Sequence, residues 1–266
     1  MTNIQKIIKY LSLAFAFYLI ISIIFGILSI FNLIDKINIK KEEKVKYFKT
    51  VSLDNTLDDI DINLKFTSLY IKNGDEFSVE TTNKNININQ NNDKIKIFEK
   101  TNISVNDNNK VTITIPKEKK FNNISIDSGA GTLNIESLIG ENIDLDFGAG
   151  KASVNNLISN NKTDIDTGAG SVKFNNCKLN NLDLDMGIGK LELNGYLFGK
   201  NEVDTGIGKL SINLLNSKNE YTFKVDKGIG EILLNKEKLT DSKIYGDGIN
   251  LINISGGIGT IDIKTS

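Results

Sequence analysis

The chain has 266 residues, of which 39% are hydrophobic, and its 33 acidic and 32 basic residues leave a net charge of -1. No overall field therefore attracts nucleic acid. Every basic residue is Lys and there is no His, so the bidentate guanidinium fork, the usual general base near neutral pH and the commonest transition-metal ligand are all missing. This composition argues against nucleic-acid binding and against many catalytic designs. Cys177 is the single cysteine, so no intramolecular disulfide forms, and no His activates the thiol as a nucleophile.

Residues 10–34 carry no charge, and as a helix they would be longer than a hydrocarbon core of roughly 30 Å requires. The stretch exceeds the apolar region of about 7–15 residues in a signal peptide, and no small-x-small cleavage pattern follows it. We predict a tail at 1–9, a transmembrane helix at 10–34 and a linker at 35–50, with a cleaved signal peptide as the alternative.

The lysines around this segment do not settle its orientation. Lys6 and Lys9 precede it and five lysines follow it before residue 47, contrary to a simple positive-inside count. Long C-terminal domains can cross the membrane despite flanking charge. We therefore predict a single-pass protein of the cell membrane with a cytoplasmic tail and an extracytoplasmic C-terminal domain.

Short alternating stretches fill residues 51–116, among them DIDINL, SLYI, KIKIF and KVTITIP. Asn, Asp and Gly separate them, which is typical of strands joined by turns. Pro116 is the only proline and closes a strand. The region is predicted to be all-β.

An internal repeat begins at residue 124, with seven copies such as IDSGAGTLNI, LDMGIGKLEL and VDTGIGKLSI. The first glycines lie 19 to 22 residues apart, except for a last interval of 29. A short fixed period indicates stacked units. We predict a repetitive β-solenoid over residues 51–266, with about two short strands per coil. Its structural glycines are Gly129, Gly131, Gly148, Gly150, Gly168, Gly170, Gly187, Gly189, Gly206, Gly208, Gly228, Gly230, Gly257 and Gly259.

The apolar pattern changes phase inside each copy. Leu184, Met186 and Ile188 alternate inward, and apolar positions resume at Leu191 with the opposite parity. A one-residue slip would turn the wrong face inward, so a bend or bulge is expected at Gly189. The middle residue, Ala in three copies and Ile in four, is predicted to be a core position.

Aligned copies form two further columns. One is an Asn ladder whose amides can bond along the stack: Asn155, Asn175, Asn194, Asn213 and Asn235. The other is a corner of the core that includes Cys177: Leu138, Leu157, Cys177, Tyr196 and Leu215.

Acidic pairs precede the glycines in successive copies. The candidate site residues are Asp144, Asp146, Asp164, Asp166, Asp183 and Asp185. Residues i and i+2 of a strand are roughly 6.6 Å apart, which is within the range of an inverting glycosidase pair. Catalysis needs one differentiated pair, whereas this pair recurs, so we predict no catalytic residues and no enzyme.

Three structural explanations of the acidic column compete with binding: solvation, capping of a turn N–H, and neutralisation by neighbouring lysines. The lysines in question are Lys151, Lys173, Lys190 and Lys209. The binding interpretation is a site for Ca²⁺ or a cationic partner, although the calcium nonapeptide GGxGxDxUx does not match. No other metal or cofactor is expected.

The strings GAGK and GIGK lack the GxxxxGK[ST] spacing of a phosphate loop, and a strand follows Lys209 where that loop needs a helix. Their repetition indicates turn geometry. We predict no nucleotide site.

The apolar N-terminal segment, the strands ending in TITIP and the repeated (I/L/V)DxG(A/I)G units together resemble the bacterial adhesin-like β-strand repeat proteins, also called toast-rack domains. The resemblance covers residue 51 to the C-terminus and implies an envelope-associated solenoid with no established catalytic residues. We predict a binding or scaffolding module whose partners are the membrane and an unknown protein or envelope polymer. The alternatives are a component of an envelope-stress response and a polysaccharide-active enzyme.

Overall fold

The computed structural model describes residues 49–53, 56–100 and 109–266. The predicted tail, the transmembrane helix and nearly all of the linker lie outside these ranges. Among the residues within them, no helix is both long enough and apolar enough to cross a membrane. The described chain is all-β, as predicted, and its one helical element is the short 3-10 turn η1 (Lys218–Glu220).

The strands fall into three groups along the chain. The first contains β1 (Lys49–Ser52), β2 (Asp59–Leu64), β3 (Ser68–Gly74), β4 (Ser78–Thr81), β5 (Ile86–Asn91), β6 (Lys94–Glu99) and β7 (Lys110–Pro116). The second contains β8 (Lys120–Ile135), β9 (Leu138–Asn155), β10 (Leu157–Asn180), β11 (Leu182–Phe198) and β12 (Lys200–Leu214). The third contains β13 (Tyr221–Asp226), β14 (Ile229–Leu234), β15 (Glu237–Lys238), β16 (Lys243–Tyr245), β17 (Asn250–Ser255) and β18 (Ile258–Thr265).

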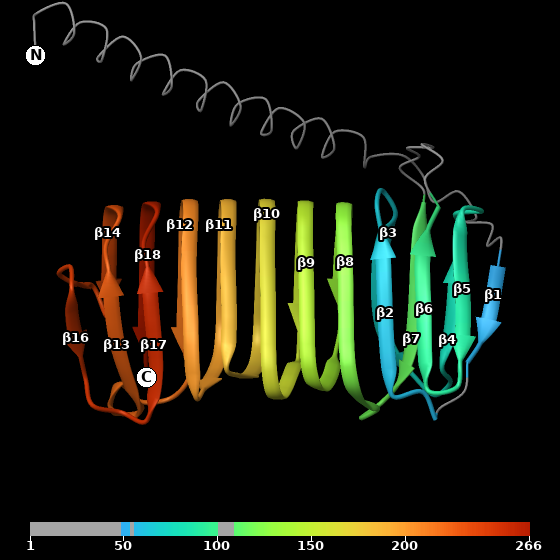
Figure 1. The fold of residues 1–266 in the computed structure, drawn as a ribbon, viewed down its shortest axis with the longest axis horizontal. Coiled ribbons are helices and arrows are strands. Elements are labelled where there is room, and N and C mark those ends of the chain that lie inside the picture. The colour runs from blue at the N-terminus through green and yellow to red at the C-terminus, as the bar shows by residue number, and fades with distance from the viewer. Residues whose placement is uncertain (1–48, 54–55, 101–108) are drawn as a thin grey trace, which may run out of the picture. The chain divides into compact units, whose positions relative to one another are not determined.

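The second group forms a stack of parallel coils (Figure 1). Each coil has a first leg before its Gly-x-Gly unit and a second leg after it. Pairing continues through the glycines, as between Gly150 and Gly170. The prediction of two short strands per coil is therefore modified, because in these coils both legs belong to one bent strand of 15 to 24 residues.

The second glycine of each unit makes the predicted bend. At Gly150 φ is +145°, and a Cβ there would lie 2.0 Å from the carbonyl oxygen of Gly131 in the preceding coil. A side chain is therefore excluded by backbone conformation and by the close approach of the preceding coil. The bend restores the inward parity, and Leu145 and Val154 on the two legs of β9 are both fully buried.

The middle residue of the unit is not in the core, contrary to our prediction. Ile188 and Ile207 are only half-buried, while Ile258 and Ile229 are 42% and 72% exposed. The chain reverses direction at the glycines, and this residue lies at the edge of the coil. The change from Ala to Ile therefore alters the outer edge.

The two predicted columns, the Asn ladder and the corner of the core, are confirmed in part. Cys177 is fully buried, and the side-chain amide of Asn175 donates to Asn155 at 3.0 Å. Tyr196 and Leu215 were wrongly placed in the core column, because the register shifts after Phe174, so that Cys177 pairs with Gly195 and Gly195 with Leu214. Tyr196 and Leu215 are half-buried.

The order of stacking differs from the order of the repeats. Ile207 pairs with Ile258, and Ile258 pairs with Ile229, so the last repeat lies between the fifth and sixth (Figure 1). The interval of 29 residues contains β15 and β16, which pair antiparallel with β14 and β13 of the outermost coil. These short strands cover part of an exposed edge.

The N-terminal end closes in a similar way. The coil of β2 and β3 lies between β8 and the layer of β6 and β7, and β5, β4 and β1 add antiparallel pairs. A buried carboxylate, Glu99, accepts hydrogen bonds from the backbone N–H groups of Lys65 (2.8 Å) and Phe66 (2.9 Å) at the turn between β2 and β3. Glu99 thus caps the first turn of the stack, a role that its sequence context did not indicate.

Candidate functional site: an acidic face on the first legs

Two columns of carboxylates lie on the first legs, and together we call them the acidic face. The glycine-proximal column contains Asp127, Asp146, Asp166, Asp185 and Asp204, and the distal column contains Asp144, Asp164, Asp183 and Glu202; the members of each column are paired in register. Adjacent strands are about 4.8 Å apart. The structure therefore brings all six predicted site residues together.

An open groove of about 460 Å³ follows the glycine-proximal column. Its walls include four of the carboxylates and two hydroxyls: Asp146, Asp166, Asp185, Asp204, Thr167 and Thr205. The hydroxyls are engaged with the backbone, since Thr205 donates to the carbonyl of Ser255 at 3.3 Å and accepts from the N–H of Gly257 at 2.8 Å. The carboxylates are the groups that remain to face a partner.

Partial burial raises the pKa of Asp146, Asp166 and Asp185 above the ordinary value, and neighbouring carboxylates raise it further. The pKa values of Asp144 and Asp183 are raised by the same causes. Ionised neighbours at strand spacing repel each other. The in-register arrangement therefore carries an electrostatic penalty at neutral pH.

Lysine side chains form ion pairs with the distal column. Lys162 Nζ lies 2.7 Å from Asp164, and Lys200 Nζ lies 2.6 Å from Glu202. No ion pair within 4.0 Å involves Asp146, Asp166 or Asp185 in the part of the chain that the structure describes. The glycine-proximal column is thus less compensated than the distal one.

The predicted neutralising lysines lie elsewhere. Lys173 and Lys190 both form ion pairs with Glu192 on the second leg, and Lys209 also lowers the pKa of Glu192. Residues after the glycines project from the opposite leg, so these three lysines do not pair with the acidic face. Neutralisation by them was a wrong prediction.

Capping of turn N–H groups is also unsupported for this column. Among the described residues, no backbone N–H donates to the carboxylates of Asp146, Asp166 or Asp185, although Asp127 accepts from Asn63 Nδ2 at 2.6 Å. The same residues contain no group of three or more His, Cys, Asp or Glu arranged to hold a metal ion. Calcium binding stays a prediction, which the melting temperature with and without Ca²⁺ would test.

The aspartates of the face resemble one another from coil to coil. Partial burial is the leading cause that raises the pKa of five of them, Asp144, Asp146, Asp166, Asp183 and Asp185, whereas a glycosidase uses one pair that its surroundings set apart. Burial raises the pKa of the Cys177 thiol to about 11, which keeps it protonated near neutral pH.

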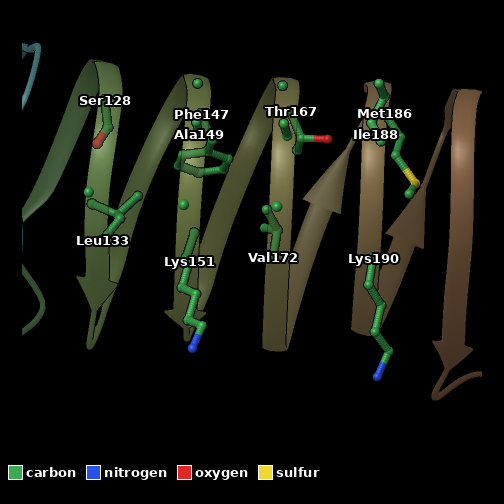
Figure 2. A pocket seen from close by; sticks show the side chains of 17 residues that line it. Ser128, Leu133, Phe147, Ala149, Lys151, Thr167, Val172, Met186, Ile188 and Lys190 are labelled. Atoms are coloured by element: carbon green, nitrogen blue, oxygen red, sulfur yellow. The ribbon is translucent and has the colours of Figure 1, made fainter. Parts of the chain in front are cut away.

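Beneath the glycine turns is a hollow of about 20 Å³, lined in part by Phe147, Val172 and Met186 (Figure 2). It has room for about one water molecule. Lys151 and Lys190 extend along the second legs in this view. The glycine strings thus build the turns of the stack, and no helix N-terminus follows them to receive a phosphate.

The sequence profile of the family described as Toastrack DUF4097 matches residues 34–247. The chain belongs to the toastrack DUF4097 family. No curated protein sequence matches it.

Solved structures similar to this toastrack chain share little sequence with it. A "putative cell adhesion protein" from Clostridium sporogenes is 18% identical, with 83% of this chain and 100% of that chain covered and a TM-score of 0.37. A "putative adhesin" from Bacteroides fragilis is 14% identical, with coverages of 84% and 98% and a TM-score of 0.40. A "putative lipid binding protein" from Parabacteroides distasonis is 13% identical, with coverages of 82% and 96% and a TM-score of 0.32. These values are too low to carry an argument about function.

Proposed function

We propose that this toastrack protein is a non-enzymatic binding or scaffolding module of the cell envelope, held at the membrane by residues 10–34, with its β domain outside the cytoplasm. The acidic face is its principal binding surface, and its partner is a cationic protein or envelope polymer. Membership of the toastrack family and the uncharged N-terminal stretch support this proposal.

The observation that carries the proposal is the in-register glycine-proximal column. Asp146, Asp166 and Asp185 repel one another, their pKa values are raised, and no described lysine forms an ion pair with them. Side chains that weaken a fold without a local structural role are typical of binding surfaces. A cationic partner would relieve the repulsion along several coils at once, and repetitive stacks suit extended contacts of this kind.

The test is retention of the full-length protein, in nanodiscs, on envelopes isolated from cells that lack it. The triple variant Asp146→Asn, Asp166→Asn and Asp185→Asn removes three charges from the acidic face. The matched control Asp75→Asn, Glu76→Gln and Asp93→Asn removes three charges from exposed positions elsewhere.

We expect the acidic-face variant to lose most of its retention and the control to keep it, with the difference shrinking at high salt because exposed charges are screened. Equal retention of both variants would contradict the role of the acidic face. An envelope-stress sensor differs in one respect: the captured partner would be a membrane protein. A polysaccharide-active enzyme would release oligosaccharides and depend on one Asp pair.

A further inference from the structure

A second hollow lies on the opposite legs, near the N-terminal end of the stack. It has a volume of about 580 Å³, within the range of about 300–1,000 Å³ that is usual for small-molecule sites. Its walls come from β3, β7, β8 and β9. The acidic face belongs to the first legs, so the two sites are separate.

An aromatic ring stands between two shorter polar side chains in this hollow. Thr112 of β7 pairs with Tyr70 of β3, and Tyr70 pairs with Asn134 of β8. Their strand neighbours Leu69 and Ile71 are buried, so Tyr70 points to the outer face by strand alternation. Because Thr112 and Asn134 are shorter than tyrosine, space opens on both sides of the ring.

Thr112 contributes a polar group to the hollow. The residue is 8% exposed and lines the hollow, and its hydroxyl, which is accessible to solvent, has no hydrogen-bond partner among the described residues. A ligand in the hollow could therefore hydrogen-bond to it. The side-chain polar groups of Tyr70 and Asn134 also have no described protein partner, so three groups that can donate or accept are directed to one space.

The margin of the hollow is fixed and close to neutral. Asn155 is held by the amide of Asn175, which donates to it at 3.0 Å, and Glu136 accepts from the N–H of Asn73 at 3.0 Å. Lys72 and Lys110 bring two positive charges to the hollow, and two carboxylates lie near them: Glu136 in its lining and Glu80, which pairs with Thr112 between β4 and β7. The site therefore has no excess of cations to select an anion.

These features suit one class of ligand. A sugar ring presents an apolar face to an aromatic ring and hydroxyls that both donate and accept, which matches Tyr70 with Thr112 and Asn134. An added peptide strand would need an open backbone edge, but β3 is paired with β7 on one side and β8 on the other. We propose that this Tyr70 hollow binds a neutral saccharide segment, an inference that rests on the proposed role as an envelope-binding module.

The experiment is calorimetric titration of the full-length protein in nanodiscs, which avoids detergents with sugar head groups. The probes are four tetrasaccharides: β-1,4-linked N-acetylglucosamine, β-1,4-linked mannose, α-1,4-linked glucose and β-1,3-linked glucose, each up to about 10 mM, a concentration that detects millimolar affinity. Variants are Tyr70→Ala, Tyr70→Phe and Asn134→Ala. The matched control is Tyr196→Ala, which removes another half-buried tyrosine.

We expect at least one probe to bind, Tyr70→Ala to weaken it on the order of tenfold, and Tyr70→Phe and Tyr196→Ala to change it less than about threefold. No binding by any probe, or equal binding by Tyr70→Ala, would overturn the inference. Envelope retention separates the two proposals, because failure of the saccharide site alone leaves the loss caused by the acidic-face variant intact.

Discussion

Asn63 on β2 donates a 2.6 Å hydrogen bond to the carboxylate of Asp127 in the neighbouring coil, across 64 residues of sequence. The first member of the glycine-proximal column therefore has a neutral polar partner on one side. Asp166, by contrast, pairs with Asp146 on one side and Asp185 on the other. This difference identifies where repulsion along the column is greatest.

Asp166→Asn is expected to raise the free energy of unfolding at pH 7 by about 0.5 kcal/mol, within the 0.2–1 kcal/mol range of cross-strand pairs. The amide removes one charge between two carboxylates and keeps the shape of the side chain. Urea denaturation of the full-length protein measures the change. Asp75→Asn, at an exposed position outside the column, should leave stability unchanged.

The pH dependence of this gain follows from the raised pKa of Asp166. The folded state binds a proton more tightly than the unfolded state, so stability falls as pH rises from the unfolded pKa through the folded one. The advantage of Asp166→Asn should thus be full at neutral pH and vanish below 3.8, the ordinary pKa of an aspartate. A gain independent of pH would show that repulsion is not its cause.

Glu99→Ala is expected to destabilise the fold by about 3 kcal/mol, because it leaves three buried or partly buried donors without this acceptor. Those donors are the N–H groups of Lys65 and Phe66 and the amide of Asn83, which donates at 2.9 Å. Glu99→Gln keeps one oxygen and should cost less. Thermal unfolding of both variants measures which of them is less stable. A loss of stability that is no larger for Glu99→Ala than for Glu99→Gln would contradict the capping role.

The edge position of the middle residue predicts that Ala149→Ile is tolerated within about 0.5 kcal/mol, as for other surface substitutions. Gly150→Ala in the same turn should cost about 3 kcal/mol or more, since φ is +145° and the added Cβ meets the backbone of Gly131. Denaturation midpoints compare the two variants. A large loss of stability in Ala149→Ile would show that this position packs in the core and would contradict its place at the edge of the coil.

The repeated part of the fold was predictable because its physical constraints recur in every coil. The glycine bend at Gly150 and the amide contact between Asn175 and Asn155 follow from columns visible in the sequence. The six aspartates were likewise placed together by their period. These features depend only on neighbouring copies.

The ends of the stack were not predictable in this way. A Gly-x-Gly unit fits against any other, so the motif cannot show that Ile258 lies between Ile207 and Ile229. The interval of 29 residues was the available signal. Glu99 and Tyr70 belong to non-repeated strands, and their contacts depend on which distant strands pair, which local patterns do not specify.

Treatment of intact cells with external protease, while a tag placed after Ser266 is followed, tests most directly whether the β domain is anchored outside the cytoplasm. A cytoplasmic protein serves as the lysis control. We predict that the tag is lost while the control stays intact. Protection of the tag in intact cells, with digestion after lysis, would place the domain in the cytoplasm and contradict the envelope-binding role.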